Sequence, residues 1–89
     1  MTYVMDIAPS CERSIEKACK KNPVLRDALR NKMREVLENP SRYKTLRHDM
    51  AGERRVHILK SFVLKFEIDE GRKIVNFLSF EHHDEAYRR

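Results

Sequence analysis

Residues 54–81 read RRVHILKSFVLKFEIDEGRKIVNFLSFE, and this stretch decides the fold. Apolar residues recur at every second position over residues 54–59 and again over residues 62–68, which is typical of strands. Lys60 and Ser61 between these runs fit a two-residue hairpin loop. After a turn at residues 69–71, residues 73–81 are apolar on both faces, as in a central strand. The stretch therefore predicts an antiparallel β-meander.

Two helices are predicted upstream of the meander. Asn22 followed by Pro23 is a typical helix start, and Asn39 before Pro40 ends the helix because proline disfavours helical geometry in the preceding residue. The apolar residues between these points form one stripe at helical spacing: Leu25, Ala28, Leu29, Met33, Val36 and Leu37. A first helix fits residues 9–21. Because almost nothing joins the two helices, we expect an antiparallel hairpin.

The chain begins with a further strand at residues 2–7, where Tyr3, Met5 and Ile7 share one face by the two-residue period. The expected order is therefore β-α-α-β-β-β. Residues 43–46 fit either one extra short strand or an entry loop. We expect a single α+β domain that spans residues 1–89.

Composition narrows the class of protein. The 89 residues are 40% hydrophobic and 37% charged, which suits a small core under a charged surface and excludes a disordered tail. The formal net charge is +5, and the excess of Lys and Arg is concentrated at residues 42–60. A basic domain favours polyanionic partners without specifying one.

Cys11 and Cys19 are expected to be reduced thiols. Eight residues along a helix separate them by roughly 12 Å, whereas a disulfide needs Cα atoms within about 7 Å. The chain also contains no apolar run near the roughly 18 residues of a membrane span and no recognisable signal peptide. We therefore expect a soluble cytoplasmic protein without a membrane partner.

Arg55 and His57 form the first candidate site. On a strand they point away from the face that carries Val56 and Ile58, about 7 Å apart along the chain. Arginine can hold a phosphate through two hydrogen bonds, and histidine can move a proton near neutral pH. The same pattern also fits a solvated strand whose charges discourage edge pairing.

Two further clusters flank the meander. His82, His83 and Asp84 follow its last strand, with Tyr87 four residues after His83, and could serve in acid–base chemistry or simply form a polar terminus. Their spacing does not favour a metal site, which needs three or four converging ligands. Upstream, Lys44 and Arg47 could contact RNA phosphates and His48 could be a further proton donor, or the three could form an ordinary basic loop.

In this order and spacing, the helical hairpin, the basic stretch, RVHI, SFVLKFEID and the terminal HHDEAYRR resemble the RelE/ParE toxin superfamily over essentially the whole chain. The nearest resemblance is to its YafQ-like branch, which has a histidine loop before a glycine, an Arg–His strand, and a histidine four residues before a terminal aromatic. The corresponding residues here are His48, Gly52, Arg55 with His57, and His83 with Tyr87.

The resemblance implies the toxin of a type II toxin–antitoxin system, which cleaves mRNA on the ribosome without a metal or other cofactor. A cognate antitoxin is implied to cover the catalytic face. The RNA 2′-OH would attack the adjacent phosphate. The resemblance implies His57 and His83 as proton-transfer residues, Arg55 as the phosphate-stabilising residue, His48 as an assisting residue, and Tyr87 as a stacking or acid–base residue.

The predicted RNA-binding residues are Lys44, Arg47, Arg54 and Lys60. Two other functions stay open, because a fold does not fix a function. ParE-like members of the superfamily inhibit DNA gyrase and show no nuclease activity. A basic domain that binds RNA or DNA without catalysis is the third possibility.

Overall fold

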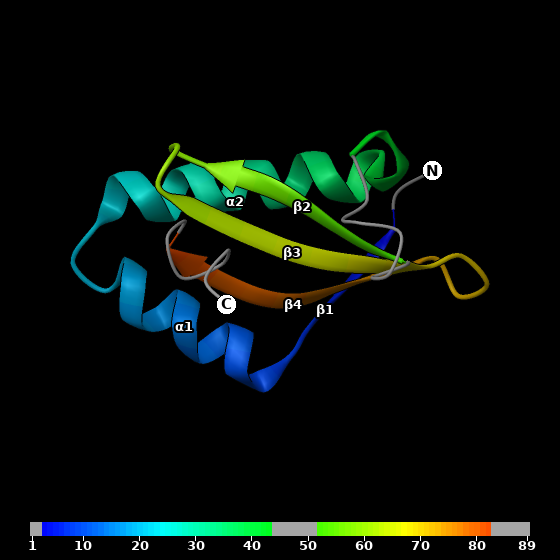
Figure 1. The fold of residues 1–89 in the computed structure, drawn as a ribbon, viewed down its shortest axis with the longest axis horizontal. Helices are drawn as coiled ribbons and strands as arrows, with labels where there is room; N and C mark the ends of the chain where they lie inside the picture. Colours follow the sequence, from blue (N-terminus) through cyan, green and yellow to red (C-terminus); the bar gives the residue numbers. More distant parts are fainter. Residues whose placement is uncertain (1–2, 44–51, 83–89) are drawn as a thin grey trace.

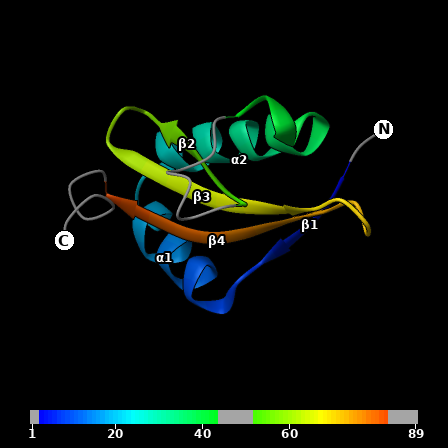
Figure 2. The ribbon, with the colours of Figure 1, turned by 45° about the vertical axis from the view of Figure 1, so that its right-hand side comes forward.

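The computed structural model describes residues 3–43 and 52–82. Its elements follow the expected order: β1 (Val4–Ile7), α1 (Pro9–Cys19), α2 (Pro23–Glu38), a short 3-10 helix η1 (Pro40–Arg42), β2 (Glu53–Ile58), β3 (Phe62–Asp69) and β4 (Ile74–His82). Both helices lie on the same side of the sheet (Figures 1 and 2). The α+β prediction, with a strand, a helical hairpin and a meander, is confirmed.

The described strands form one sheet in the order β1-β4-β3-β2. Strands β2, β3 and β4 are antiparallel neighbours, as the meander predicts. Strand β1 pairs with β4 in parallel, so the sheet is mixed rather than wholly antiparallel. Strand β4 is therefore central, which explains why its sequence is apolar on both faces.

The α1–α2 turn follows from local sequence chemistry. The side-chain oxygen of Asn22 accepts a hydrogen bond from the backbone N–H of Leu25 at 3.1 Å, and Pro23 occupies the first turn of α2. Helix α1 ends at Cys19, two residues before the expected end at Lys21, because the backbone N–H of Asn22 donates to the Cys19 carbonyl at 3.2 Å and closes a turn there. Helix α2 ends at Glu38, directly before Asn39-Pro40, as predicted.

The β2–β3 connection differs from the expected two-residue loop. Strand β2 ends at Ile58, which is paired with Phe62, so the loop contains residues 59–61. Leu59 and Lys60 have φ angles of 52° and 66°, in the left-handed region. The backbone N–H of Ser61 donates to the Leu59 carbonyl at 2.7 Å, and the chain leaves the strand one residue early.

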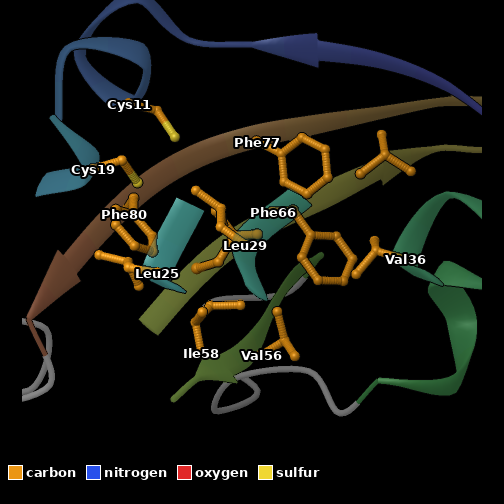
Figure 3. Close-up of a cluster of buried hydrophobic side chains, with 12 residues drawn as sticks. Cys11, Cys19, Leu25, Leu29, Val36, Val56, Ile58, Phe66, Phe77 and Phe80 are labelled. Atoms are coloured by element: carbon orange, nitrogen blue, oxygen red, sulfur yellow. The ribbon is translucent and has the colours of Figure 1, made fainter. Parts of the chain in front are cut away.

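The core lies between the helices and the facing side of the sheet (Figure 3). Helix α2 contributes Leu25, Leu29 and Val36, and β3 and β4 contribute aromatic side chains that include Phe66 and Phe77. Both phenylalanines are 0% exposed. Full burial of such a side chain contributes roughly 1.5–3 kcal/mol. The packing of this core fixes which residues of each strand point away from the helices.

Candidate functional site

The outward face of β2 carries the first candidate pair. Val56 and Ile58 are buried in the core at 8% and 1% exposure. Arg55, which precedes Val56, is half-buried, and His57, which lies between Val56 and Ile58, is exposed. The strand alternation predicted from the sequence is therefore confirmed, and the guanidinium and the imidazole project from the same face of β2.

Pairing with the neighbouring strands extends this face into two cross-strand rows. One row joins His57 on β2 to Val63 on β3 and Glu81 on β4. Val63 is 0% exposed and is not part of the core under the helices.

The second row joins Arg55 to Lys65 and Ser79. The two rows are linked by an ion pair, in which Nζ of Lys65 lies 3.9 Å from Oε1 of Glu81. We call the outward side chains of these two rows the basic face: His57, Val63, Glu81, Arg55, Lys65 and Ser79.

A β-bulge in β4 shapes this face. Lys65 pairs with Ser79, but the next residue of β3, Phe66, pairs with Phe77, so Leu78 is an extra residue. The bulge shifts the alternation by one residue, which places Ser79 and Glu81 on the outward face. The sequence indicates this bulge, because the core residues Phe77 and Phe80 are three positions apart. Core residues of a regular strand are two positions apart.

Arg54 lies apart from the basic face. It is paired with Phe66, whose side chain is in the core, so it belongs to the helix side of β2. Its Nη1 donates to the carbonyls of Tyr43 at 2.5 Å and Ser41 at 3.4 Å. These bonds hold η1 and the residue after it against β2, which is a structural role for a residue predicted to bind RNA. Lys60 is exposed at the tip of the β2–β3 hairpin.

His82 ends β4 on the helix side of the sheet, since its ring meets that of Phe62 edge-on at 5.5 Å. The other predicted site residues lie outside the described residues: Lys44, Arg47, His48, His83 and Tyr87. The convergence of His57 and His83 therefore stays a prediction. Within residues 3–43 and 52–82, no three His, Cys, Asp or Glu side chains gather in a way that could hold a metal ion.

A groove of about 480 Å³ opens on the helix side, between the two helices and β1. Its apolar lining comes from both helices and the strand: Met5, Ile7, Ile15, Cys19, Leu29, Met33 and Leu37. Arg26, Arg30 and Arg34 also line it, spaced four residues apart along α2, so they follow one edge of that helix. We call this feature the arginine groove.

Sequence reasoning missed both the arginine groove and part of the basic face. The four-residue spacing of Arg26, Arg30 and Arg34 was available as a signal in the sequence. Lys65 stands between two core residues of an alternating strand, which places it outward. The side of the sheet on which Glu81 lies could not be predicted from the sequence, because it depends on the bulge in β4.

The two cysteines are free thiols on the buried side of α1, and the expectation that they are not joined in a disulfide is confirmed. Burial raises the pKa of the Cys11 thiol to about 11. Burial also raises the pKa of Cys19, although the positive charge of Arg26 acts to lower it. Both thiols therefore serve as small apolar core residues. None of the described helices is long and apolar enough to cross a membrane.

The sequence matches a known protein family and is similar to a known protein. The family model for the ParE toxin of type II toxin–antitoxin systems, parDE, matches residues 7–87. A Methanocaldococcus jannaschii protein named as a candidate toxin, RelE4, is 42% identical over 87 residues, which cover 98% of this chain and 93% of that protein.

Solved structures share the fold at lower identity. The toxin–antitoxin complex RelBE2 of Mycobacterium tuberculosis contains a chain with a TM-score of 0.77 and 21% identity, covering 93% of this chain and 100% of its own. The E. coli DinJ-YafQ toxin–antitoxin complex contains a chain with a TM-score of 0.77 and 14% identity, covering 99% of this chain and 100% of its own.

Proposed function

Because this chain belongs to the ParE toxin family of type II toxin–antitoxin systems, within the RelE/ParE superfamily, we propose that it is an endoribonuclease toxin that cleaves mRNA on the ribosome. The observation that carries the proposal is the shared outward face of Arg55 and His57 on β2. A guanidinium beside an imidazole can bind a phosphate and transfer a proton, which are two tasks of phosphodiester cleavage. The proposal places the protein in the cytoplasm, where its substrate is found.

The reaction uses the RNA's own 2′-OH as nucleophile. A base takes the 2′-OH proton, the 2′-oxygen forms a bond to phosphorus, and the bond from phosphorus to the 5′-oxygen breaks as an acid protonates that oxygen. His57 and His83 are assigned to the two proton transfers, and Arg55 to the charge that develops on the phosphate. His48 is assigned an assisting role and Tyr87 a stacking or acid–base role.

A second function has one observation in its favour. The family model that matches this chain describes ParE toxins, and the notable alternative within the superfamily is inhibition of DNA gyrase without nuclease activity. That function requires no proton-transfer pair, so it gives no reason for His57 to stand exposed beside Arg55. We therefore place it second.

Primer extension on translating ribosomes separates the two functions. The wild-type toxin is expected to truncate the transcript, and His57→Ala and His83→Ala are each expected to reduce cleavage by about 100-fold or more, the range for loss of a general acid or base. If the transcripts stay intact and supercoiling by gyrase is lost, the nuclease proposal is refuted and inhibition of gyrase is supported. Normal cleavage by both variants would refute the assignment of the histidines.

The partner of a type II toxin is an antitoxin, and the solved relatives named above come from toxin–antitoxin complexes. We infer that one helix of the antitoxin binds in the arginine groove. The groove has an apolar floor and one basic edge, which is complementary to an amphipathic helix with acidic residues along one border. Because the groove lies on the helix side of the sheet, an antitoxin that also covers the basic face must wrap around the molecule.

A further inference from the structure

Glu81 is the acidic residue among the six side chains of the basic face. It lies on β4 in the same cross-strand row as His57, with Val63 of β3 between them. Because neighbouring strands are about 5 Å apart, the Cα atoms of Glu81 and His57 are separated by about 10 Å. A single nucleotide can span this distance, so a carboxylate stands beside the place where the scissile phosphate is proposed to bind.

The ion pair with Lys65 leaves the Glu81 carboxylate able to bind a further group. Nζ of Lys65 lies 3.9 Å from Oε1 of Glu81, which is longer than a hydrogen bond, and the side chain of Glu81 is 41% exposed. An ionised carboxylate accepts about four hydrogen bonds through its two oxygens. Both oxygens therefore keep the capacity to accept hydrogen bonds from a ligand.

The bulge at Leu78 determines which side of the sheet carries this carboxylate. Without the extra residue, the alternation set by Val75 and Phe77 would turn Glu81 toward the helices. Bulges are frequent next to active sites, where they redirect a side chain. In this protein the redirected side chain is an acceptor of hydrogen bonds on the face that is proposed to bind RNA.

Among the groups of RNA, guanine matches a carboxylate best. Phosphate oxygens are negatively charged and repel Glu81. Adenine and cytosine each offer one amino group, beside a ring nitrogen that is itself an acceptor. Guanine presents two N–H donors, N1–H and the 2-amino group, side by side on its Watson–Crick edge. These donors can bind both oxygens of one carboxylate, and such paired, charge-assisted hydrogen bonds are strong and specific.

We infer that Glu81 is a specificity-determining residue that binds the Watson–Crick edge of a guanine next to the scissile phosphate. This inference rests on the proposed endoribonuclease function and specifies the nucleotide beside which the enzyme cuts. Glu81 holds the guanine while the 2′-oxygen attacks and the 5′-oxygen leaves. It exchanges no proton with the RNA, and the two proton transfers stay with His57 and His83.

An mRNA that contains inosine tests this role, because inosine lacks the 2-amino group of guanosine. Single-turnover cleavage on the ribosome is measured with guanosine or inosine at each nucleotide that flanks the mapped cut. The wild type is expected to cut the inosine transcript about tenfold more slowly or worse, the effect of losing one hydrogen bond to a charged group. Glu81→Gln is expected to cut the two transcripts at rates within threefold of each other.

The distribution of cut sites gives a second readout. The wild type is expected to cut next to guanine, whereas Glu81→Gln should lose this preference and gain adenine, because an amide can accept from the adenine amino group and donate to a ring nitrogen. Glu67→Gln is the matched control. It makes the same change on the outward side of β3, in the row that Glu67 forms with Glu53 and Asn76, and should leave the cut sites unchanged.

The possible failures are distinguishable. If the wild type shows no preference for guanine, or if Glu81→Gln keeps that preference, the role of Glu81 is refuted while the nuclease function stands. Uniform slowing of Glu81→Gln at unchanged cut sites also refutes recognition of guanine, because Glu81 would then act only through its ion pair with Lys65. A wild type that leaves all RNA intact refutes the proposed function and this inference with it.

Discussion

Arg55 and Lys65 are direct partners across β2 and β3, and both side chains point away from the helices. Like charges at such a position repel one another, and the carboxylate of Glu81, 3.9 Å from the ammonium of Lys65, offsets part of that repulsion. Both cations lie on the face of the sheet opposite the helices, outside the core that stabilises the fold.

The position of Arg55 outside the core predicts that one substitution affects activity far more than stability. Arg55→Thr introduces a good strand former and leaves the core intact, so the free energy of unfolding should change by less than about 1 kcal/mol. Cleavage of mRNA should fall by about 100-fold or more. Urea denaturation and a single-turnover assay measure the two effects, and a loss of stability of more than about 2 kcal/mol would show that Arg55 has a structural role instead.

The β2–β3 hairpin stores backbone strain that can be removed. Leu59 has a φ of 52°, where a non-glycine residue costs about 1–2 kcal/mol, and its side chain is 48% exposed and contributes little to the core. Leu59→Gly should therefore stabilise the protein by about 1 kcal/mol in thermal or urea denaturation. Ser61→Gly is the control, since Ser61 has no positive φ, and it should destabilise the protein slightly.

The arginine groove predicts a charge-reversal phenotype. Arg30→Glu should weaken binding of the antitoxin encoded beside the toxin gene by about tenfold or more, because it replaces attraction with repulsion at the edge of the groove. The loss should shrink at high salt. Isothermal titration measures it, with Arg13→Glu on the exposed side of α1 as the control. Equal effects of the two variants would indicate a general charge effect and no binding in the groove.

The buried thiol of Cys11 predicts a loss of stability in alkali. Because burial raises its pKa in the folded protein from 9.0 to about 11, its contribution to stability is complete below pH 9 and is lost as the pH rises through 11. Cys11→Ala should be less stable than the wild type at pH 8, with the difference narrowing toward pH 11. A constant difference between the two unfolding curves would contradict this.

The sequence predicts the elements of this fold well where the signal is local. Asn22-Pro23 and Asn39-Pro40 mark both ends of α2, and the two-residue period correctly assigns Val56 and Ile58 to the core. The partner of β1 was not predictable, because it depends on where a strand some 70 residues later comes to lie. The extra loop residue at Leu59 also lacked a signal, since leucine rarely adopts a positive φ.

Of the candidate site, the sequence predicted only the residues that lie on a single strand. The common face of Arg55 and His57 follows from alternation within β2. Lys65 becomes their neighbour through the register between strands, and Glu81 joins them through the bulge in β4. Neither feature can be deduced from a single alternating run, because a shift of one residue would turn every side chain to the other face.

The central claim, cleavage by the RNA's own 2′-OH, is tested most directly by the chemistry of the cut ends. Translating ribosomes are supplied with an mRNA that carries either ribose or 2′-deoxyribose at the mapped cleavage position. We expect the ribose transcript to be cut to a 2′,3′-cyclic phosphate and a 5′-hydroxyl and the deoxy transcript to stay whole. Equal cleavage of both transcripts, or of neither, would contradict it.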